Sequence, residues 1–345
     1  MKLEHEILRI HTKHAFTIAR GGASEWRVVM VRVTDRDGAD GWGEAAPSRF
    51  YGENADTVLA ALAQFAPVLE RADAWALEDI ETELARVMRG NAAARCAVSA
   101  ALHDMAGKRL GVPVARLLGL DPARAPRSSF TIGIDAPDEL RRKVREAAGY
   151  PILKVKLGGD HDEETLRIIR EQAPDAILRV DANAAWSAKH TLGMMNCLVA
   201  HRVEFVEQPL PPHDIAGLRF VRERSPLPII ADESCLVATD IPRLAGAVDG
   251  INIKLAKCGG LREAVKMAAV ARAHGMLVMM GCMIETSLGI TAAAHLAPLL
   301  DYADLDGAAL LADDPFRGAT IDHGIIALPG APGLGVTRAS PGAAR

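Results

Sequence analysis

Charged and polar side chains recur at the carboxyl ends of short apolar runs in the second half of the chain. The set comprises Lys154, Lys156, Asp181, Asn183, Glu207, Asp232, Glu233, Lys254, Asp304 and Asp306. Alternate residues of a strand share one face, so the pairs 154/156, 181/183 and 304/306 can each point to one side. Buried charges are costly unless they pair or bind a metal. This repetition at matching strand ends therefore predicts one shared site.

Three of the carboxylates, Asp181, Glu207 and Asp232, follow successive runs. They would form an all-oxygen site without histidine or cysteine, which selects Mg²⁺ or Mn²⁺ over Zn²⁺. A small number of protein ligands also suits Mg²⁺, which keeps positions for water and substrate. We therefore predict a magnesium site formed by these three residues.

The runs that position these groups are eight in number and recur at intervals of about 25 residues. They span residues 129–134, 152–158, 176–183, 203–209, 228–234, 250–256, 277–283 and 302–307. Helix-length segments separate them, which indicates parallel strands. Eight such strands favour a closed α/β barrel over a doubly wound open sheet. In a barrel the chemistry lies at the carboxyl ends of the strands.

Two lysines are candidates for acid–base work in this barrel. Lys156 on the second run and Lys254 on the sixth would lie roughly across the barrel from each other. A lysine is a useful base when its pKa falls toward neutrality, which nearby cations promote; here these would be the metal and Lys154. Two bases on opposite faces of one carbon are what a 1,1-proton transfer requires.

The first part of the chain has a different texture. Strand-like runs at 3–10 and 26–34 precede a turn signal at 35–38, and helical periodicity dominates from Asn54. We predict an α+β domain over residues 1–125 and a barrel domain over 126–314. A tail, 315–345, would pack back on the first unit.

The order and spacing of the KxK at Lys154–Lys156, the three carboxylates and Lys254 resemble the muconate-lactonizing subgroup of the enolase superfamily. The resemblance covers the whole chain. It implies a modified TIM barrel, (β/α)7β, with an α+β capping domain formed by the N-terminal part and the C-terminal tail. It also implies Mg²⁺ as cofactor, Lys156 and Lys254 as the two bases, and Lys154 helping Mg²⁺ to stabilise an ene-diolate. Asn183 and Glu233 would support these groups without binding the metal.

Several activities share this set of residues: cycloisomerase, o-succinylbenzoate synthase, N-acylamino acid racemase and dipeptide epimerase. Asp304-Leu305-Asp306 resembles the DxD of dipeptide epimerases, whose acids hold the N-terminal ammonium of the substrate. The stretch 281–287 resembles that group too. The resemblance thus implies an isomerase that moves the α-proton of the C-terminal residue of a dipeptide. The alternatives are a racemase or synthase of the same subgroup, a non-catalytic binding barrel, and, for the DxD, acids that cap a helix or turn.

Two stretches of the capping domain, 16–22 and 47–53, are expected to set specificity. Arg20 resembles the arginine that meets the side-chain carboxylate in L-Ala-D/L-Glu epimerases, with an ordinary loop arginine as the alternative. Phe50 stands where those relatives more often carry arginine, which leaves a hydrophobic second residue open. Glu53 could instead favour a cationic one. L-Ala-D/L-Glu, in murein peptide metabolism, is the first expectation.

Bulk composition excludes several other classes. The net charge of −4 gives no electrostatic footprint for nucleic acid. The five cysteines form no CxxC or CxxH pair, which argues against a zinc site and a disulfide framework and favours a reducing compartment. The N-terminus lacks the apolar core of a signal peptide, and Glu285 interrupts the most apolar stretch, 275–300. We expect a cytoplasmic homo-oligomer with a small-molecule dipeptide as partner, and neither nucleic acid nor membrane.

Overall fold

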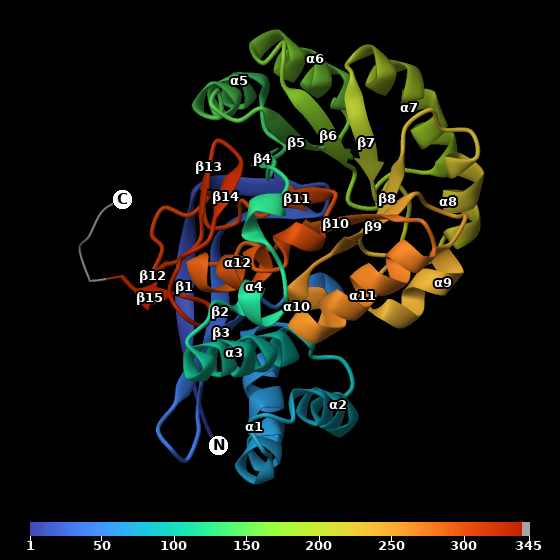
Figure 1. Cartoon of the computed structure of the whole chain (residues 1–345). Helices are drawn as coiled ribbons and strands as arrows, with labels where there is room; N and C mark the ends of the chain where they lie inside the picture. Colours follow the sequence, from blue (N-terminus) through green and yellow to red (C-terminus); the bar gives the residue numbers. More distant parts are fainter. Residues whose placement is uncertain (340–345) are drawn as a thin grey trace.

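An antiparallel sheet of three strands, with helices against it, forms the cap of the molecule (Figure 1). The computed structural model describes residues 1–339. The elements of the cap region are β1 (Lys2–Ile18), β2 (Gly21–Thr34), β3 (Asp40–Ala45), η1 (Arg49–Tyr51), α1 (Ala55–Arg71), α2 (Leu77–Val87), α3 (Ala92–Leu110), α4 (Val114–Leu117) and η2 (Pro122–Arg124). The β1–β2 hairpin is longer than the strands predicted at 3–10 and 26–34, so the predicted loop 16–22 is the tip of this hairpin.

Eight parallel strands follow one another around the second sheet in sequence order. They are β4 (Phe130–Ile132), β5 (Ile152–Lys156), β6 (Ile177–Asp181), β7 (Val203–Glu207), β8 (Ile229–Ala231), β9 (Gly250–Ile253), β10 (Leu277–Gly281) and β11 (Tyr302–Asp304). A parallel bridge between Ser128 and Ala303 joins the first strand to the last. The Ser129 amide also donates to the Ala303 carbonyl at 3.0 Å. The predicted eight-stranded barrel is confirmed.

Helical segments follow each of the first seven strands of the barrel, and the tail follows the eighth (Figure 1). They are α5 (Pro137–Glu146), α6 (Asp162–Gln172), α7 (Ala188–Ala200), α8 (Ile215–Arg222), η3 (Ala238–Asp240) with α9 (Ile241–Leu244), α10 (Leu255–Cys258) with α11 (Leu261–Ala273), and α12 (Ser287–Ala294) with η4 (Ala297–Leu299). This arrangement is the (β/α)7β pattern that the sequence predicted. Within the described residues, no helix has both the length and the apolar character needed to cross a bilayer.

The strands end earlier than the predicted runs, and this changes how some site residues are placed. Asp232 and Lys254 are the first residues after β8 and β9, while Asn183 and Asp306 lie two positions beyond β6 and β11. Strand alternation alone therefore does not place Asn183 and Asp306, yet Asp304 and Asp306 both line the central cavity, as predicted, and Asn183 contacts Asp181. Asn183 instead has a φ of 45°, in the left-handed region, which turns the chain back toward Asp181.

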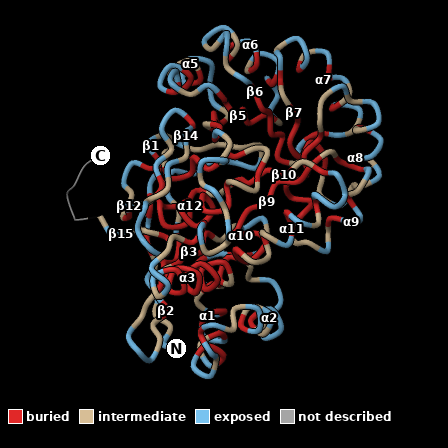
Figure 2. Tube along the Cα trace, viewed as in Figure 1, coloured by how far each residue is buried: buried red, intermediate tan, exposed pale blue. Residues whose placement is uncertain are grey.

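Helix α3 packs against β3 of the cap sheet and α10 of the barrel, and its largely red trace in Figure 2 shows that it is buried. Its many alanines allow the backbone of β3 to approach closely: a Cβ on Gly43 would lie 2.0 Å from the Ala97 carbonyl oxygen, so only glycine fits there. On the same strand, buried Glu44 accepts a hydrogen bond from the Thr286 amide at 3.0 Å, at the start of α12. These contacts hold the cap against the carboxyl ends of the barrel strands.

The tail consists of two small antiparallel pairs. They are β12 (Phe316–Arg317) with β15 (Thr337–Arg338), and β13 (Thr320–Asp322) with β14 (Ile325–Ala327). Arg338 pairs with Glu6 of β1 at 2.8 Å, while the Ser128 amide donates to the Gly324 carbonyl beside the first barrel strand. We propose that the cap comprises residues 1–125 together with the tail from 315. The last part of that predicted tail, 340–345, lies outside the described residues.

Candidate active site

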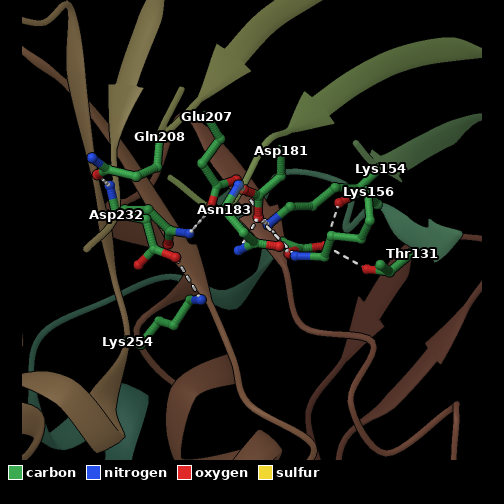
Figure 3. Close-up of polar contacts among 12 residues, drawn as sticks. Thr131, Lys154, Lys156, Asp181, Asn183, Glu207, Gln208, Asp232 and Lys254 are labelled. Atoms are coloured by element: carbon green, nitrogen blue, oxygen red, sulfur yellow. Dashed lines mark hydrogen bonds and ion pairs between the residues drawn. The ribbon is translucent and has the colours of Figure 1, made fainter. Parts of the chain in front are cut away.

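Three carboxylates gather at the carboxyl ends of three neighbouring strands (Figure 3). Asp181 ends β6, Glu207 ends β7 and Asp232 follows β8. All three are buried, and one oxygen from each lies within 4.8 Å of the others. The structure thus brings together the three residues that the sequence predicted as metal ligands.

Lysines approach these carboxylates from opposite sides. Lys156 on β5 lies 2.7 Å from Asp181 Oδ2, and Lys254 after β9 lies 2.8 Å from Asp232 Oδ2. β5 and β9 are separated by β6, β7 and β8 in the barrel, so the two lysines stand about half a turn apart. Figure 3 shows them on opposite sides of the carboxylate group. A flat carbon centre between them could exchange protons with both.

Burial and charge pairing compete in setting the ionisation of this cluster. Burial opposes the charged forms of Asp181 and Asp232, but the neighbouring lysines hold both pKa values below the ordinary range. For Glu207, burial and repulsion from Asp181 raise the pKa to about 7. Burial also opposes the charge of Lys254, yet the attraction of Asp232 raises its pKa. The cluster therefore favours the charged form of Lys254.

Unpaired acceptor atoms beside the triad test whether a cation fits there. Asn183 Oδ1, Glu233 Oε2 and Asn252 Oδ1 are buried without a hydrogen-bond partner, although buried acceptors in proteins are normally satisfied. Each belongs to a residue that contacts or adjoins a triad carboxylate. Water molecules on a hard divalent cation would supply the missing donors, because Mg²⁺ keeps several of its waters. The site therefore fits Mg²⁺.

The two acids of the DxD lie on the far side of the same site. Asp304 accepts a hydrogen bond from Ser129 Oγ at 2.7 Å and pairs with Lys154 at 2.8 Å. Asp306 accepts hydrogen bonds from the Thr131 amide at 2.6 Å and from Thr131 Oγ1 at 3.3 Å. Neither carboxylate caps a helix, and both line the central cavity.

A cavity of about 820 Å³ lies between the barrel and the cap. Barrel residues that line it include the polar Thr131, Lys154, Lys156, Asn183, Lys254, Asp304 and Asp306 and the apolar Cys282, Met283 and Ile284. Cap residues that line it include Phe16, Ile18, Arg20, Trp26, Val28, Arg49 and Phe50. Both stretches predicted to set specificity, 16–22 and 47–53, thus face the site. The apolar part of the cavity lining comes mainly from the cap.

Arg20 is anchored within this cavity wall. Its Nη1 donates to Glu233 Oε1 at 2.7 Å and to the Asn183 carbonyl at 2.6 Å, and the Phe50 ring covers the guanidinium at 4.2 Å from the ring centroid. Arg20 remains about one-third exposed, while the Glu233 side chain is fully buried. The arginine therefore ties the hairpin tip to the barrel and keeps its other nitrogens for a ligand.

Glu53 is anchored at the start of α3. Its two carboxylate oxygens accept hydrogen bonds from the amides of Ala92 at 2.7 Å and Ala93 at 3.0 Å, at the start of α3. A carboxylate at a helix N-terminus satisfies unpaired amides and favours the helix dipole. Glu53 is therefore tied to α3, and since it also lines the central cavity, the suggestion that it favours a cationic residue stays a prediction.

Sequence reasoning missed three residues that hold the site. Asn252 Nδ2 donates to Glu207 Oε1 at 2.7 Å, Gln208 Oε1 accepts from the Asp232 amide at 2.9 Å, and Lys257 contacts Asp232 directly. Asn252 could have been found, because it precedes Lys254 by two positions on a strand whose end faces the site. Gln208 follows Glu207 directly, but its role depends on a left-handed backbone, with φ 32°, that the sequence does not signal.

The fold and the site together define a class of barrel enzyme that works on a proton of a carboxylate-bearing substrate. Two family models match the chain: the enolase C-terminal domain-like family over residues 138–340, and the mandelate racemase / muconate lactonizing enzyme N-terminal domain over residues 4–119. The chain therefore belongs to the mandelate racemase / muconate lactonizing enzyme family of the enolase superfamily.

Characterised relatives match over nearly the full length. The L-Ala-D/L-Glu epimerase of Bacteroides thetaiotaomicron is 40% identical, covering 98% of this chain and 88% of that protein. The L-Ala-D/L-amino acid epimerase of Pedosphaera parvula is 41% identical, covering 92% and 93%. A crystal structure of the dipeptide epimerase of Enterococcus faecalis, complexed with Mg and L-Leu-L-Tyr, superposes with a TM-score of 0.93 at 34% identity, covering 98% and 99%.

Proposed function

We propose that the chain is a dipeptide epimerase, an isomerase that moves the α-proton of the C-terminal residue of a dipeptide from one face of the carbon to the other. The observation that carries the proposal is the placement of Lys156 and Lys254 on opposite sides of one carboxylate cluster. The named activities of the relatives, on L-Ala-D/L-Glu and on other dipeptides, support it.

Each lysine would serve one face of the substrate α-carbon. In its neutral form, Lys156 or Lys254 takes the proton from the face that it meets, and the opposite lysine, as a cation, gives a proton to the other face. Lys154 is buried 2.7 Å from Glu207 and places a fixed positive charge beside the carboxylate that gains charge as the proton leaves. The cap above the cavity keeps bulk water from the exposed carbon.

Asp181, Glu207 and Asp232 would hold Mg²⁺, the metal named in the Enterococcus faecalis structure. Bound there, the metal supplies a Lewis acid for the substrate carboxylate. Asp232 would then share its charge between the metal and Lys254. The attraction that raises the pKa of Lys254 would weaken, and this is the direction that a lysine base requires.

Different walls of the cavity would bind the N-terminal ammonium of the dipeptide and the side chain of its second residue. Asp304 and Asp306 would receive the N-terminal ammonium through charge-assisted hydrogen bonds, and we expect an L-residue such as alanine at that position. Arg20 would meet the side chain of the second residue, and glutamate is our first expectation. Phe50 beside it adds apolar surface that also suits a hydrophobic side chain.

The experiment that tests this function is α-proton exchange in deuterated water. The purified enzyme with Mg²⁺ is incubated with a dipeptide library, and mass spectrometry reads deuterium uptake while chiral chromatography reads epimerisation. Free dipeptides should exchange at the C-terminal residue alone. Faster turnover of N-acyl amino acids than of free dipeptides would refute the dipeptide assignment and favour the N-acylamino acid racemase.

We also propose a cytoplasmic location and a homo-oligomeric state. All five cysteines are free, which suits a reducing compartment. Fractionation of the native cells tests the location, and light scattering on the eluting protein tests the oligomeric state.

A further inference from the structure

A second lysine lies behind the metal-ligand carboxylate Asp232. Lys257 stands on α10, one turn after Lys254, and is 4% exposed. Its ammonium contacts Asp232 Oδ1 and donates to three backbone carbonyls, those of Asp232 at 2.8 Å, Asn252 at 3.0 Å and Cys235 at 3.4 Å. A buried ammonium with this many acceptors is fixed in position.

The two lysines divide the two oxygens of Asp232 between them. Lys254 contacts Oδ2 and lines the central cavity, whereas Lys257 contacts Oδ1 and does not line the cavity. Lys257 therefore has no path to a substrate proton. Its charge acts on the Asp232 carboxylate from the side away from the cavity.

Lys257 is also connected to a second carboxylate of the triad. The Asn252 carbonyl accepts its hydrogen bond, while the Asn252 side chain donates to Glu207 Oε1 at 2.7 Å. The Lys257 ammonium thus links Asp232, the first residue after β8, to Asn252 of β9. Through the Asn252 side chain it also fixes the orientation of Glu207. Residues that hydrogen-bond to metal ligands, without binding the metal themselves, orient those ligands and so set the geometry of a metal site.

We propose that Lys257 is a positioning residue that presets Asp232 for the metal. By holding Oδ1, it leaves Oδ2 as the oxygen that Asp232 offers to the cation, so Asp232 binds through one oxygen. Without Lys257, Oδ1 would be buried and unpaired, and the carboxylate would turn to share both oxygens with Lys254. The inference rests on the proposed metal site but not on the identity of the substrate.

The test measures Mn²⁺ binding in the absence of substrate, by electron paramagnetic resonance of the free ion. Lys257→Met keeps the side-chain length and removes the charge, and we expect the Kd for Mn²⁺ to rise about 10- to 100-fold. Lys143→Met is the matched control: Lys143 is also buried and paired, with Asp135 at 2.8 Å, but contacts no triad residue. Its Kd should equal that of the wild type.

Lys257→Gln covers the case in which the methionine variant does not fold, because the amide keeps donors for the backbone carbonyls. It should show the same direction of change. Wild-type Kd in a folded variant, with only the melting temperature lowered, would overturn the proposal and leave Lys257 as a structural lysine; a tighter Kd would overturn it as well. Lys254→Met separates the two functions, since it should lose epimerisation while still binding Mn²⁺. If the wild type binds no Mn²⁺, the metal site itself fails.

Discussion

Lys154 Nζ lies 2.8 Å from Asp304 Oδ2, so the first acid of the DxD is already paired with a cation of the barrel. The same ammonium lies 2.7 Å from Glu207 and 3.3 Å from Asp181. The Asp306 carboxylate, in contrast, accepts hydrogen bonds only from the amide and hydroxyl of Thr131 among residues 1–339. The two acids are therefore not equivalent: Lys154 connects Asp304 to the triad, whereas no described lysine or arginine pairs with Asp306.

We predict that Asp306→Asn damages the binding of the dipeptide ammonium. Removing one partner of a desolvated charge pair costs about 2–5 kcal/mol, which corresponds to a loss of about 30- to 4000-fold in kcat/KM. Steady-state kinetics with L-Ala-L-Glu and L-Ala-L-Leu measure the loss.

N-acetylation of the dipeptide removes the same cation from the other side and supplies the control. The substitution and the acetyl group should act non-additively, because both delete one interaction. Additive losses, or an unimpaired Asp306→Asn enzyme, would show that the ammonium lies elsewhere.

A pH dependence follows from the same residue. Burial and repulsion from Asp304 raise the pKa of Asp306 to about 7. Below that pH the carboxyl is neutral in the free enzyme and cannot pair with the ammonium. At saturating Mg²⁺ we expect kcat/KM to fall about tenfold per pH unit below pH 7. This limb should be absent from kcat, because bound ammonium lowers the pKa of Asp306, and absent from the profile of Asp306→Asn.

Mutation of either base, Lys156 or Lys254, should affect epimerisation and α-proton exchange differently. Lys156→Ala or Lys254→Ala should abolish epimerisation, since one face of the carbon loses its proton carrier. With one stereoisomer of the substrate, the remaining lysine should still exchange its own α-proton with deuterated water. Mass spectrometry and chiral analysis of each stereoisomer separate the two outcomes. Near wild-type epimerisation by either variant would contradict the assignment.

Much of this site could be predicted from the sequence because a barrel places strand ends together. Eight apolar runs fixed the order of the strands, and the carboxylates Asp181, Glu207 and Asp232 at three successive ends had to meet. Lys156 and Lys254 followed from the same count of strands. The expected metal ligands and the two lysines could be placed from the strand ends, although Asp232 and Lys254 lie one residue beyond their strands.

The contacts between cap and barrel could not be predicted in the same way. Arg20 and Glu233 are 213 positions apart in the sequence, and no local sequence pattern predicts that the tip of the β1–β2 hairpin contacts the end of β8. The contact of Glu53 with the start of α3 was not predicted either, because it becomes visible only when the helix is placed. Lys257 was missed because a lysine after a strand end looks like a surface charge until the turn of α10 buries it.

The specificity for the side chain of the second residue depends on which hydrogen-bond donors of Arg20 are still available to a substrate. One nitrogen is committed to Glu233 and Asn183, and Phe50 covers one face of the guanidinium. A glutamate side chain would therefore meet an arginine whose charge is partly compensated but whose position is fixed, and fixed donors lose less entropy on binding. This arrangement allows both glutamate and an apolar side chain, with different dependence on Arg20.

We accordingly expect Arg20→Ala to lower kcat/KM for L-Ala-L-Glu about 10- to 100-fold more than for L-Ala-L-Leu, in line with a hydrogen bond to a charged group. Loss of the tie to Glu233 would harm both substrates alike, so the ratio of the two values isolates the contact with the substrate. Phe50→Arg should shift that ratio toward glutamate by adding a cation to the same wall. Equal losses for both substrates in Arg20→Ala would mean that Arg20 only anchors the hairpin tip, and that the second residue is read by the apolar wall of the cap.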